Sequence, residues 1–139
     1  MKKLTLIFVL SILFFNLAKA VTPPPAVQKA FQEKFPTATN VKWGKENAND
    51  FEAEFKLDGK KVSANFSMKG AWLETETEFP VVDLPEAVVA SINKKFGGWK
   101  IVGADKIESA KKPIRYEADI KSGMKKKEVV LYENGKFTK

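Results

Sequence analysis

Three glutamates with alternate spacing are the side chains of this sequence most suggestive of chemistry. The stretch Leu73 to Pro80, LETETEFP, contains Glu74, Glu76 and Glu78. Alternate residues of a β-strand share one face, and three carboxylates in a row could bind a hard cation such as Ca²⁺. Such neighbours lie roughly 7 Å apart, however, so one ion would need further ligands, and a solvated strand face is the alternative. A glycosidase would need a second placed carboxylate and a cleft, and the sequence indicates neither.

Two missing residue types exclude most other catalytic chemistry. The 139 residues include no cysteine and no histidine. Ser-His-Asp triads, thiolate nucleophiles and Cys/His zinc sites are therefore excluded, and so are disulfides. We expect a protein that is not an enzyme, with no catalytic residues, no metal centre of that kind and no cofactor.

Residues 1–20 have the pattern of a signal peptide. Lys2 and Lys3 precede the apolar run 4–15, and Ala18-Lys19-Ala20 supplies small residues before a cleavage site. The run of 12 residues is shorter than the roughly 20 that a membrane span requires. We predict cleavage after Ala20, export to the periplasm or the exterior, and no membrane attachment afterwards.

The charge of the chain gives little support for nucleic-acid binding. The formal net charge is +7, and it falls to +4 without the three lysines of residues 1–20. The remaining lysines alternate with acids along most predicted strands, and no base-stacking motif is present. We therefore expect no nucleic-acid partner.

Two segments have the apolar spacing i, i+4, i+8 of a helix with one buried face. The first covers residues 26–35 and ends before Pro36, and the second opens at Leu84-Pro85 and ends at Gly97-Gly98. Their apolar residues are Val27, Phe31 and Phe35 in the first and Val88, Ile92 and Phe96 in the second.

Period-two alternation predicts strands around these helices. The expected strands are 41–43, 51–57, 62–68, 71–79, 99–107, 114–121 and 127–132, with a last turn at Asn134-Gly135 before Phe137. The second and sixth share a five-residue pattern, FEAEF at 51–55 and YEADI at 116–120, 65 positions apart. The helices match at an offset of 61.

This internal similarity predicts a tandem repeat. The expected units are a first repeat at 21–80 and a second at 81–139, which together form one structural domain. Each unit alone is too small to bury a good core. We predict an α+β fold in which two helix-plus-antiparallel-strand repeats share one antiparallel sheet and both helices pack on one face of it.

The order of these motifs resembles the PepSY-like family. The shared features are a proline-opened helix, Val-x-Trp at 41–43, [Phe/Tyr]-Glu-Ala-x-[Phe/Ile], a glycine hairpin and Gly-x-Trp at 70–72. The resemblance implies a small exported bacterial protein related in fold to the β-lactamase inhibitor protein. The chain departs from the family pattern at Ser67 and Tyr132, where an aspartate often opens the last turn. It also lacks that inhibitor's disulfides, so the resemblance does not imply β-lactamase inhibition.

The face of the sheet opposite the helices is the predicted binding surface. If Phe51, Phe55 and Phe66 point to the helices, alternation turns another set of residues outward. That set is Glu52, Glu54, Ser63, Asn65 and Ser67, then Glu117, Asp119, Glu128, Val130 and Tyr132. Alternation also places Trp72 with the glutamates of its strand, and Phe137 matches it.

Uncovered aromatic residues among charges suit protein or peptide recognition. We therefore expect an exported, non-catalytic binding module, resembling a protein or peptidase inhibitor, that acts through this face on an envelope or secreted protein or peptide and is a monomer. The predicted contact residues are Trp72, Glu74, Glu76, Tyr132 and Phe137. Alternatively, these aromatics close the sheet ends or pack under loops, and the Glu74-Glu76-Glu78 strand binds a cation or a small ligand of the envelope.

Overall fold

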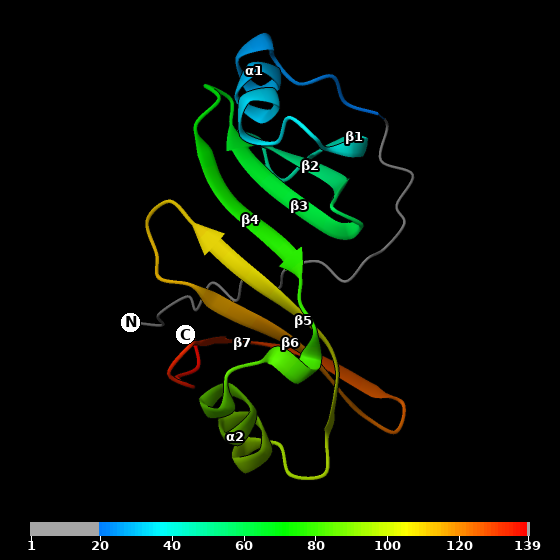
Figure 1. The fold of residues 1–139 in the computed structure, drawn as a ribbon, viewed down its shortest axis with the longest axis vertical. Coiled ribbons are helices and arrows are strands. Elements are labelled where there is room, and N and C mark those ends of the chain that lie inside the picture. The colour runs from blue at the N-terminus through cyan, green and yellow to red at the C-terminus, as the bar shows by residue number, and fades with distance from the viewer. Residues whose placement is uncertain (1–19, 139) are drawn as a thin grey trace, which may run out of the picture.

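A computed structural model describes residues 20–138, and the predicted signal peptide at 1–20 lies outside this range except for Ala20. The fold is a seven-stranded antiparallel sheet with two α-helices (Figure 1). The helices are α1 (Pro25–Lys34) and α2 (Glu86–Lys95), and η1 (Val81–Asp83) is a 3₁₀ turn. The strands are β1 (Thr39–Lys45), β2 (Asp50–Leu57), β3 (Lys60–Ser67), β4 (Trp72–Glu78), β5 (Lys100–Ser109), β6 (Arg115–Ser122) and β7 (Lys125–Tyr132).

Each strand pairs with the next one along the chain, so the sheet order is β1 to β7 without a crossover. Both β2–β3 and β6–β7 turn tightly, at Gly59 and Gly123, whose positive φ angles of 78° and 57° suit glycine. The β4–β5 pairing lies in the middle of the sheet although η1 and α2 separate these strands in sequence. Both halves of the chain therefore contribute to one continuous sheet.

Each helix packs on inward-facing residues of its own half. Val27 and Phe31 of α1 belong to one buried cluster with Ala53 and Phe66, and the T-shaped contact of Phe31 with Phe55 has a centroid distance of 5.0 Å. The equivalent cluster beneath α2 contains Val88, Ile92, Tyr116, Ala118 and Leu131. Figure 1 shows the two helices at opposite ends of the sheet.

The strand register shows that both helices cover the same face. Paired residues of neighbouring strands project to one side. Ala64, in the α1 cluster, pairs with Thr75; two residues along the same face of β4, Thr77 pairs with Lys106, and Lys106 pairs with Tyr116 of the α2 cluster. The predicted α+β fold with an antiparallel sheet and two helices is confirmed.

Two glycines bring the helices close to the sheet. Both Gly70 and Gly135 have positive φ, 82° and 81°. An added Cβ would lie 2.6 Å from the Ala26 carbonyl oxygen at Gly70 and 2.3 Å from the Ala87 carbonyl oxygen at Gly135. Each glycine thus permits both a turn and a close contact with the first turn of a helix.

No helix within residues 20–138 has the length and apolar character needed to cross a bilayer.

Candidate functional site on the open face of the sheet

We use the term open face for the side of the sheet opposite the helices. Its residues align in rows because the strands are paired in register. The first row is Glu52, Asn65, Glu74 and Ser109, and the second is Glu54, Ser63, Glu76, Ile107, Arg115 and Tyr132. The third is Glu78, Asp105, Glu117 and Val130, and the fourth is Gly103, Asp119 and Glu128. Glu74, Glu76 and Tyr132 therefore lie on the face predicted for them.

Crowding of carboxylates changes the acidity of Glu76. Burial, together with the nearby charges of Glu117, Glu74 and Asp105, raises the pKa of Glu76 to about 8. A carboxyl with such a pKa is largely protonated at neutral pH, because both desolvation and like charges disfavour the anion. A cation placed beside Glu76 would therefore favour its ionised form and lower its pKa.

The same effects act on both sides of Glu76. Burial, followed by the charges of Glu128 and Asp105, raises the pKa of Glu117 to about 8. In the first half, burial and the charge of Glu46 raise the pKa of Glu52 to about 7. Perturbed carboxyls of this kind gather at functional sites more often than elsewhere.

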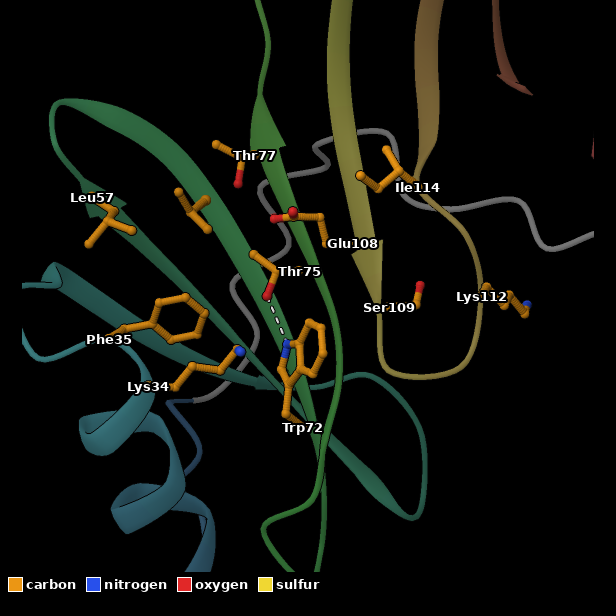
Figure 2. Close-up of a pocket in the computed structure, with 11 residues that line it drawn as sticks. Lys34, Phe35, Leu57, Trp72, Thr75, Thr77, Glu108, Ser109, Lys112 and Ile114 are labelled. Carbon is orange, nitrogen blue, oxygen red and sulfur yellow. Dashed lines mark hydrogen bonds between the residues drawn. The ribbon is translucent and has the colours of Figure 1, made fainter. Parts of the chain in front are cut away.

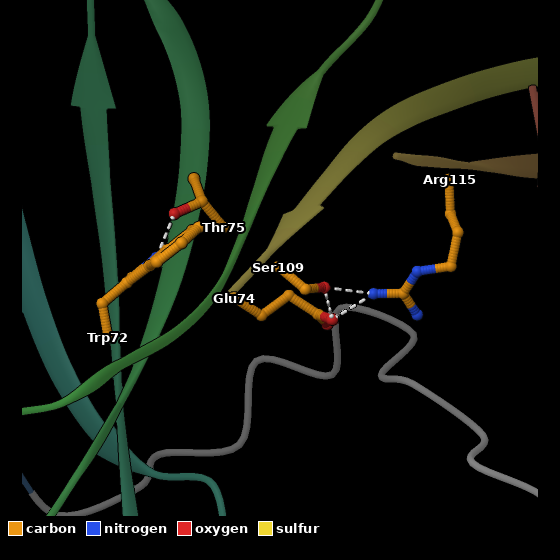
Figure 3. Close-up of polar contacts among 5 residues, drawn as sticks. All are labelled: Trp72, Glu74, Thr75, Ser109 and Arg115. Atoms are coloured by element: carbon orange, nitrogen blue, oxygen red, sulfur yellow. Dashed lines mark hydrogen bonds and ion pairs between the residues drawn. The ribbon is translucent and has the colours of Figure 1, made fainter. Parts of the chain in front are cut away.

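Lys42, which pairs with Glu54, and Arg115 are basic residues of these rows, and Arg115 binds one of the three glutamates of β4 (Figure 3). Its guanidinium forms an ion pair with Glu74 and donates to the Ser109 hydroxyl. Ser109 in turn donates to Glu74 Oε2 at 2.7 Å. Elsewhere on this strand, Glu78 Oε2 accepts a bond from the backbone N–H of Lys61 at 3.4 Å. Glu74 and Glu78 thus each have a partner of their own.

Three buried polar atoms of the described residues lack a hydrogen-bond partner, and all belong to open-face side chains. They are Asn65 Oδ1, Glu76 Oε1 and Arg115 Nε. A buried polar atom left unpaired costs about 1–3 kcal/mol. Two of the three are acceptors when Glu76 is ionised, so a ligand with hydrogen-bond donors would satisfy them.

Trp72 does not lie on the open face, which corrects the prediction from alternation. A register irregularity makes Phe66 pair with Trp72 and the preceding Asn65 pair with Glu74, so Leu73 is an extra residue between them. This bulge turns Trp72 to the helix-bearing face. There its Nε1 donates to Thr75 Oγ1 at 2.8 Å (Figure 3).

Phe137 also lies on the helix-bearing face, contrary to the prediction. The chain folds back after β7 and forms an isolated bridge between Phe137 and Leu131, which is fully buried beneath α2. The Phe137 ring lies 6.1 Å from the ring of Phe96, and Lys95 Nζ lies 4.2 Å above it. The alternative, that these aromatics pack at the sheet ends, describes both residues better.

A hollow of about 440 Å³ opens on the helix-bearing face between the end of α1 and the start of the β5–β6 loop (Figure 2). Trp72 and Lys34 form one side of it, and Glu108 and Lys112 lie on the other. Lys34 Nζ stands 3.9 Å from the centroid of the Trp72 ring. The hollow lies over the central strands that neither helix covers.

The carboxylates that lie closest together are not those of the Glu74-Glu76-Glu78 strand. Among the described residues, the one group with cation-like geometry is Glu117, Asp119 and Glu128, with carboxylate oxygens all within 4.8 Å of one another. The Glu74-Glu76-Glu78 strand is not such a group. Sequence alternation had placed the converging residues on this face, but their convergence depends on the pairing of Asp119 with Glu128.

This fold defines a class of small proteins in which two helices cover one face of an antiparallel sheet and leave the other face open. Three of the solved structures that share this fold illustrate the range of similarity. A BLIP-like protein from Bacteroides fragilis has 25% identity and a TM-score of 0.70, with 86% of this chain and 85% of that chain covered. A "putative periplasmic" protein from Bacteroides eggerthii has 16% identity and a TM-score of 0.77, with 86% and 88% covered. A DUF2874 family protein from Bacteroides ovatus has 21% identity and a TM-score of 0.75, with 86% of each chain covered.

The sequence profile of one family matches residues 49–139, and its description is "Putative beta-lactamase-inhibitor-like, PepSY-like". The chain belongs to this PepSY-like family, as its motifs predicted. No curated protein matches it. The fold is BLIP-like.

Proposed function

We propose that this protein is an exported, non-catalytic binding module that holds a basic segment of an envelope or secreted protein on its open face. The observation that carries the proposal is the concentration of carboxylates there. Glu52, Glu76 and Glu117 have raised pKa values because they are buried beside like charges. A lysine or arginine from a partner would favour their ionised forms and lower these pKa values.

Hydrogen bonding supports a partner of the same chemistry. The unpaired oxygens of Asn65 and Glu76 are acceptors, and lysine and arginine carry three and five donors. Arg115 supplies one cation to this region, but it is engaged with Glu74. A basic peptide would therefore supply donors to the two oxygens that lack a hydrogen-bond partner.

A tyrosine and an arginine lie beside the carboxylates of the open face. Ile107, Arg115 and Tyr132 follow one another across β5, β6 and β7 in a single row. Tyrosine and arginine are enriched among the residues that contribute most to interface energy. The contact residues that we propose are Glu74, Glu76 and Tyr132, whereas Trp72 and Phe137 pack against the helices and stabilise the fold.

Further parts of the proposal follow from sequence and family. The lack of cysteine and histidine favours binding over catalysis. The inhibitor-like description of the family makes an exported enzyme the first class of partner to test. We also infer that the two halves are tandem repeats, since Gly70 and Gly135 make the same helix contact 65 positions apart.

Paired double variants test the proposal. The variant Glu52→Gln/Glu76→Gln removes two carboxyls from the open face, and Glu33→Gln/Glu86→Gln removes two exposed ones from the helices. Tagged proteins would capture partners from envelope extract at low salt and release them at about 0.3 M NaCl, where exposed charges are screened. We expect the open-face variant to lose the captured basic protein and the helix variant to retain it. Equal capture by both variants, or capture insensitive to salt, would overturn the proposal.

A further inference from the structure

The carboxylates at the β6–β7 end of the open face form a compact group. Asp119 pairs directly with Glu128, and Glu117 lies two residues away on the same side of β6. Their oxygens lie within 4.8 Å of one another. A Ca²⁺ ion binds oxygens at about 2.4 Å, so two ligands on opposite sides of it are separated by about 4.8 Å. The spacing fits one shared ion of this size.

Glu117 adds an observation that does not depend on the spacing. It is only 8% exposed, yet no residue between 20 and 138 forms a hydrogen bond or ion pair with it. Lys121 and Lys126 occupy the next paired position on the same face of the two strands, and neither forms an ion pair with the group. A glutamate this buried normally has a partner, and one of its carboxylate oxygens lies within 4.8 Å of oxygens of Asp119 and Glu128.

Space is preserved beside the group. Gly103 faces Asp119 across β5 and β6, and a Cβ at this position would lie 2.7 Å from Asp119 Oδ2. The backbone φ of Gly103 is not in the left-handed region, since it is absent from the positive-φ glycines. The backbone conformation therefore does not demand glycine here, but any larger residue would require the Asp119 carboxylate to move from its present position.

The corresponding positions of the first half carry a different set of charges. Glu52 and Glu54 correspond to Glu117 and Asp119 at an offset of 65, but Ser63 stands in place of Glu128. At the position of Gly103, offset by 61, the first half has Lys42, which faces Glu54. The first half thus has two carboxylates opposite a lysine, and the second has three carboxylates opposite a glycine.

We infer that Glu117, Asp119 and Glu128 form a binding site for a hard divalent cation of the size of Ca²⁺. Their three carboxylates provide the oxygen ligands that such a cation prefers, and waters complete the six to eight ligands. The ion takes the place that Lys42 occupies in the first half. This site shares Glu117 with the proposed partner surface, but its response to Ca²⁺ is measured without any partner and stands or falls independently of partner binding.

Thermal unfolding and calorimetric titration of the purified protein test this inference. Chelator-treated protein would be titrated with CaCl₂ up to about 10 mM at constant ionic strength. A site of the affinity common in extracellular modules has a Kd of about 10⁻⁴–10⁻³ M. We expect a saturable rise in Tm of about 4 °C when Ca²⁺ reaches roughly ten times Kd, and a smaller rise with MgCl₂ because Mg²⁺ requires ligands closer together.

Matched variants identify the site. Glu128→Ser introduces the residue of the first half and should abolish the calcium response, while the Tm without calcium stays equal or rises because repulsion is relieved. Glu54→Ser removes a carboxylate from the corresponding site of the first half and should keep the full response. Gly103→Lys should also abolish the response.

Three results would overturn the inference. The first is a wild-type protein with no saturable response to Ca²⁺. The second is a Glu128→Ser variant that responds like the wild type. The third is an equal response to Mg²⁺ at the same concentrations, because that would indicate screening of the open face by any divalent ion.

Discussion

The two halves of the molecule agree on the helix-bearing face and differ on the open face. Beneath the helices, Gly70 and Gly135 make the same close contacts, with the Ala26 and Ala87 carbonyls respectively. Lysine and aromatic ring meet in both halves, as Lys34 with Trp72 and Lys95 with Phe137. The two lysines are 61 positions apart, as the helices are, and the two aromatic residues are 65 positions apart, as the strands are.

The open face has no such correspondence. The first half combines Lys42, Glu54 and Ser63, whereas the second has Gly103, Asp119 and Glu128 at the matching positions. Packing therefore accounts for what the halves share, because the same helix must be held on the same sheet. The residues that differ are those free of this requirement, and it is there that we place binding.

The largest expected effect tests the shared helix contact. Gly70→Ala and Gly135→Ala each place a Cβ within 2.6 Å of a helix carbonyl at positive φ. We expect each to lower the free energy of unfolding by about 3 kcal/mol, from overpacking and left-handed strain together. Urea denaturation would measure this.

Gly59→Ala is the matched control for these two variants. Gly59 has a φ of +78°, but no atom lies within 4 Å of the added Cβ, so strain alone should cost about 1 kcal/mol. Equal losses at Gly59 and Gly135 would show that the close helix contact is unimportant.

The next effect separates the two faces. Trp72→Ala removes a half-buried indole that packs on the α1 cluster and bonds Thr75, and we expect a loss of about 2 kcal/mol. Tyr132→Ala acts on the open face and should cost less than about 1 kcal/mol. Chemical denaturation of both variants checks the difference, and a larger loss for Tyr132→Ala would contradict the assignment of faces.

A smaller effect concerns pH. Burial and neighbouring carboxylates raise the pKa of Glu76 from 4.5 to about 8, so the folded state binds this proton more tightly than the unfolded state does. Stability should therefore decrease as pH rises from about 4.5 through 8. With solvent screening, we expect Glu76→Gln to recover about 1–2 kcal/mol at pH 9 and to have little effect at pH 4.

Glu78→Gln is the control for this pH effect, because Glu78 is exposed on the same strand. Its unfolding free energy should follow that of the wild type from pH 4 to pH 9. If Glu76→Gln also followed the wild type at every pH, Glu76 would not be held in a crowded acidic environment.

The smallest effect compares the two lysine–aromatic contacts. Lys34→Gln and Lys95→Gln each remove a cation above a ring, and each should cost about 0.5 kcal/mol. Thermal unfolding at low salt would detect shifts of similar size for the two. A stabilising effect in only one half would show that the contacts are not equivalent.

The sequence predicted the elements well because their causes are local. The apolar spacing of Val27 and Phe31 and the alternation in FEAEF depend only on which side is buried, and both patterns are found in α1 and β2. The face of Trp72 could not be predicted because one extra residue at Leu73 reverses the alternation. Phe137 was missed because its position depends on the chain folding back onto Leu131.

The carboxylate group was within reach of the sequence. A two-residue turn at Gly123 pairs Ser122 with Lys125, and counting back along both strands pairs Asp119 with Glu128. Alternation alone drew attention to three glutamates along β4, which are spaced too widely for one ion. Convergence across a hairpin was the stronger signal, since opposed residues approach more closely than same-strand neighbours.

The most direct test of the open face as the binding surface is a ratio of dissociation constants. The captured partner would be titrated calorimetrically against Glu52→Gln/Glu76→Gln and against Glu33→Gln/Glu86→Gln at low salt. Both variants lose two carboxyls, and a titration at pH 9, above the pKa values of about 7 and 8 of Glu52 and Glu76, matches their net charge so that only the face differs. We predict that the open-face variant binds at least about tenfold more weakly, equivalent to about 1.4 kcal/mol. Equal affinities, or weaker binding by the helix variant, would contradict the account.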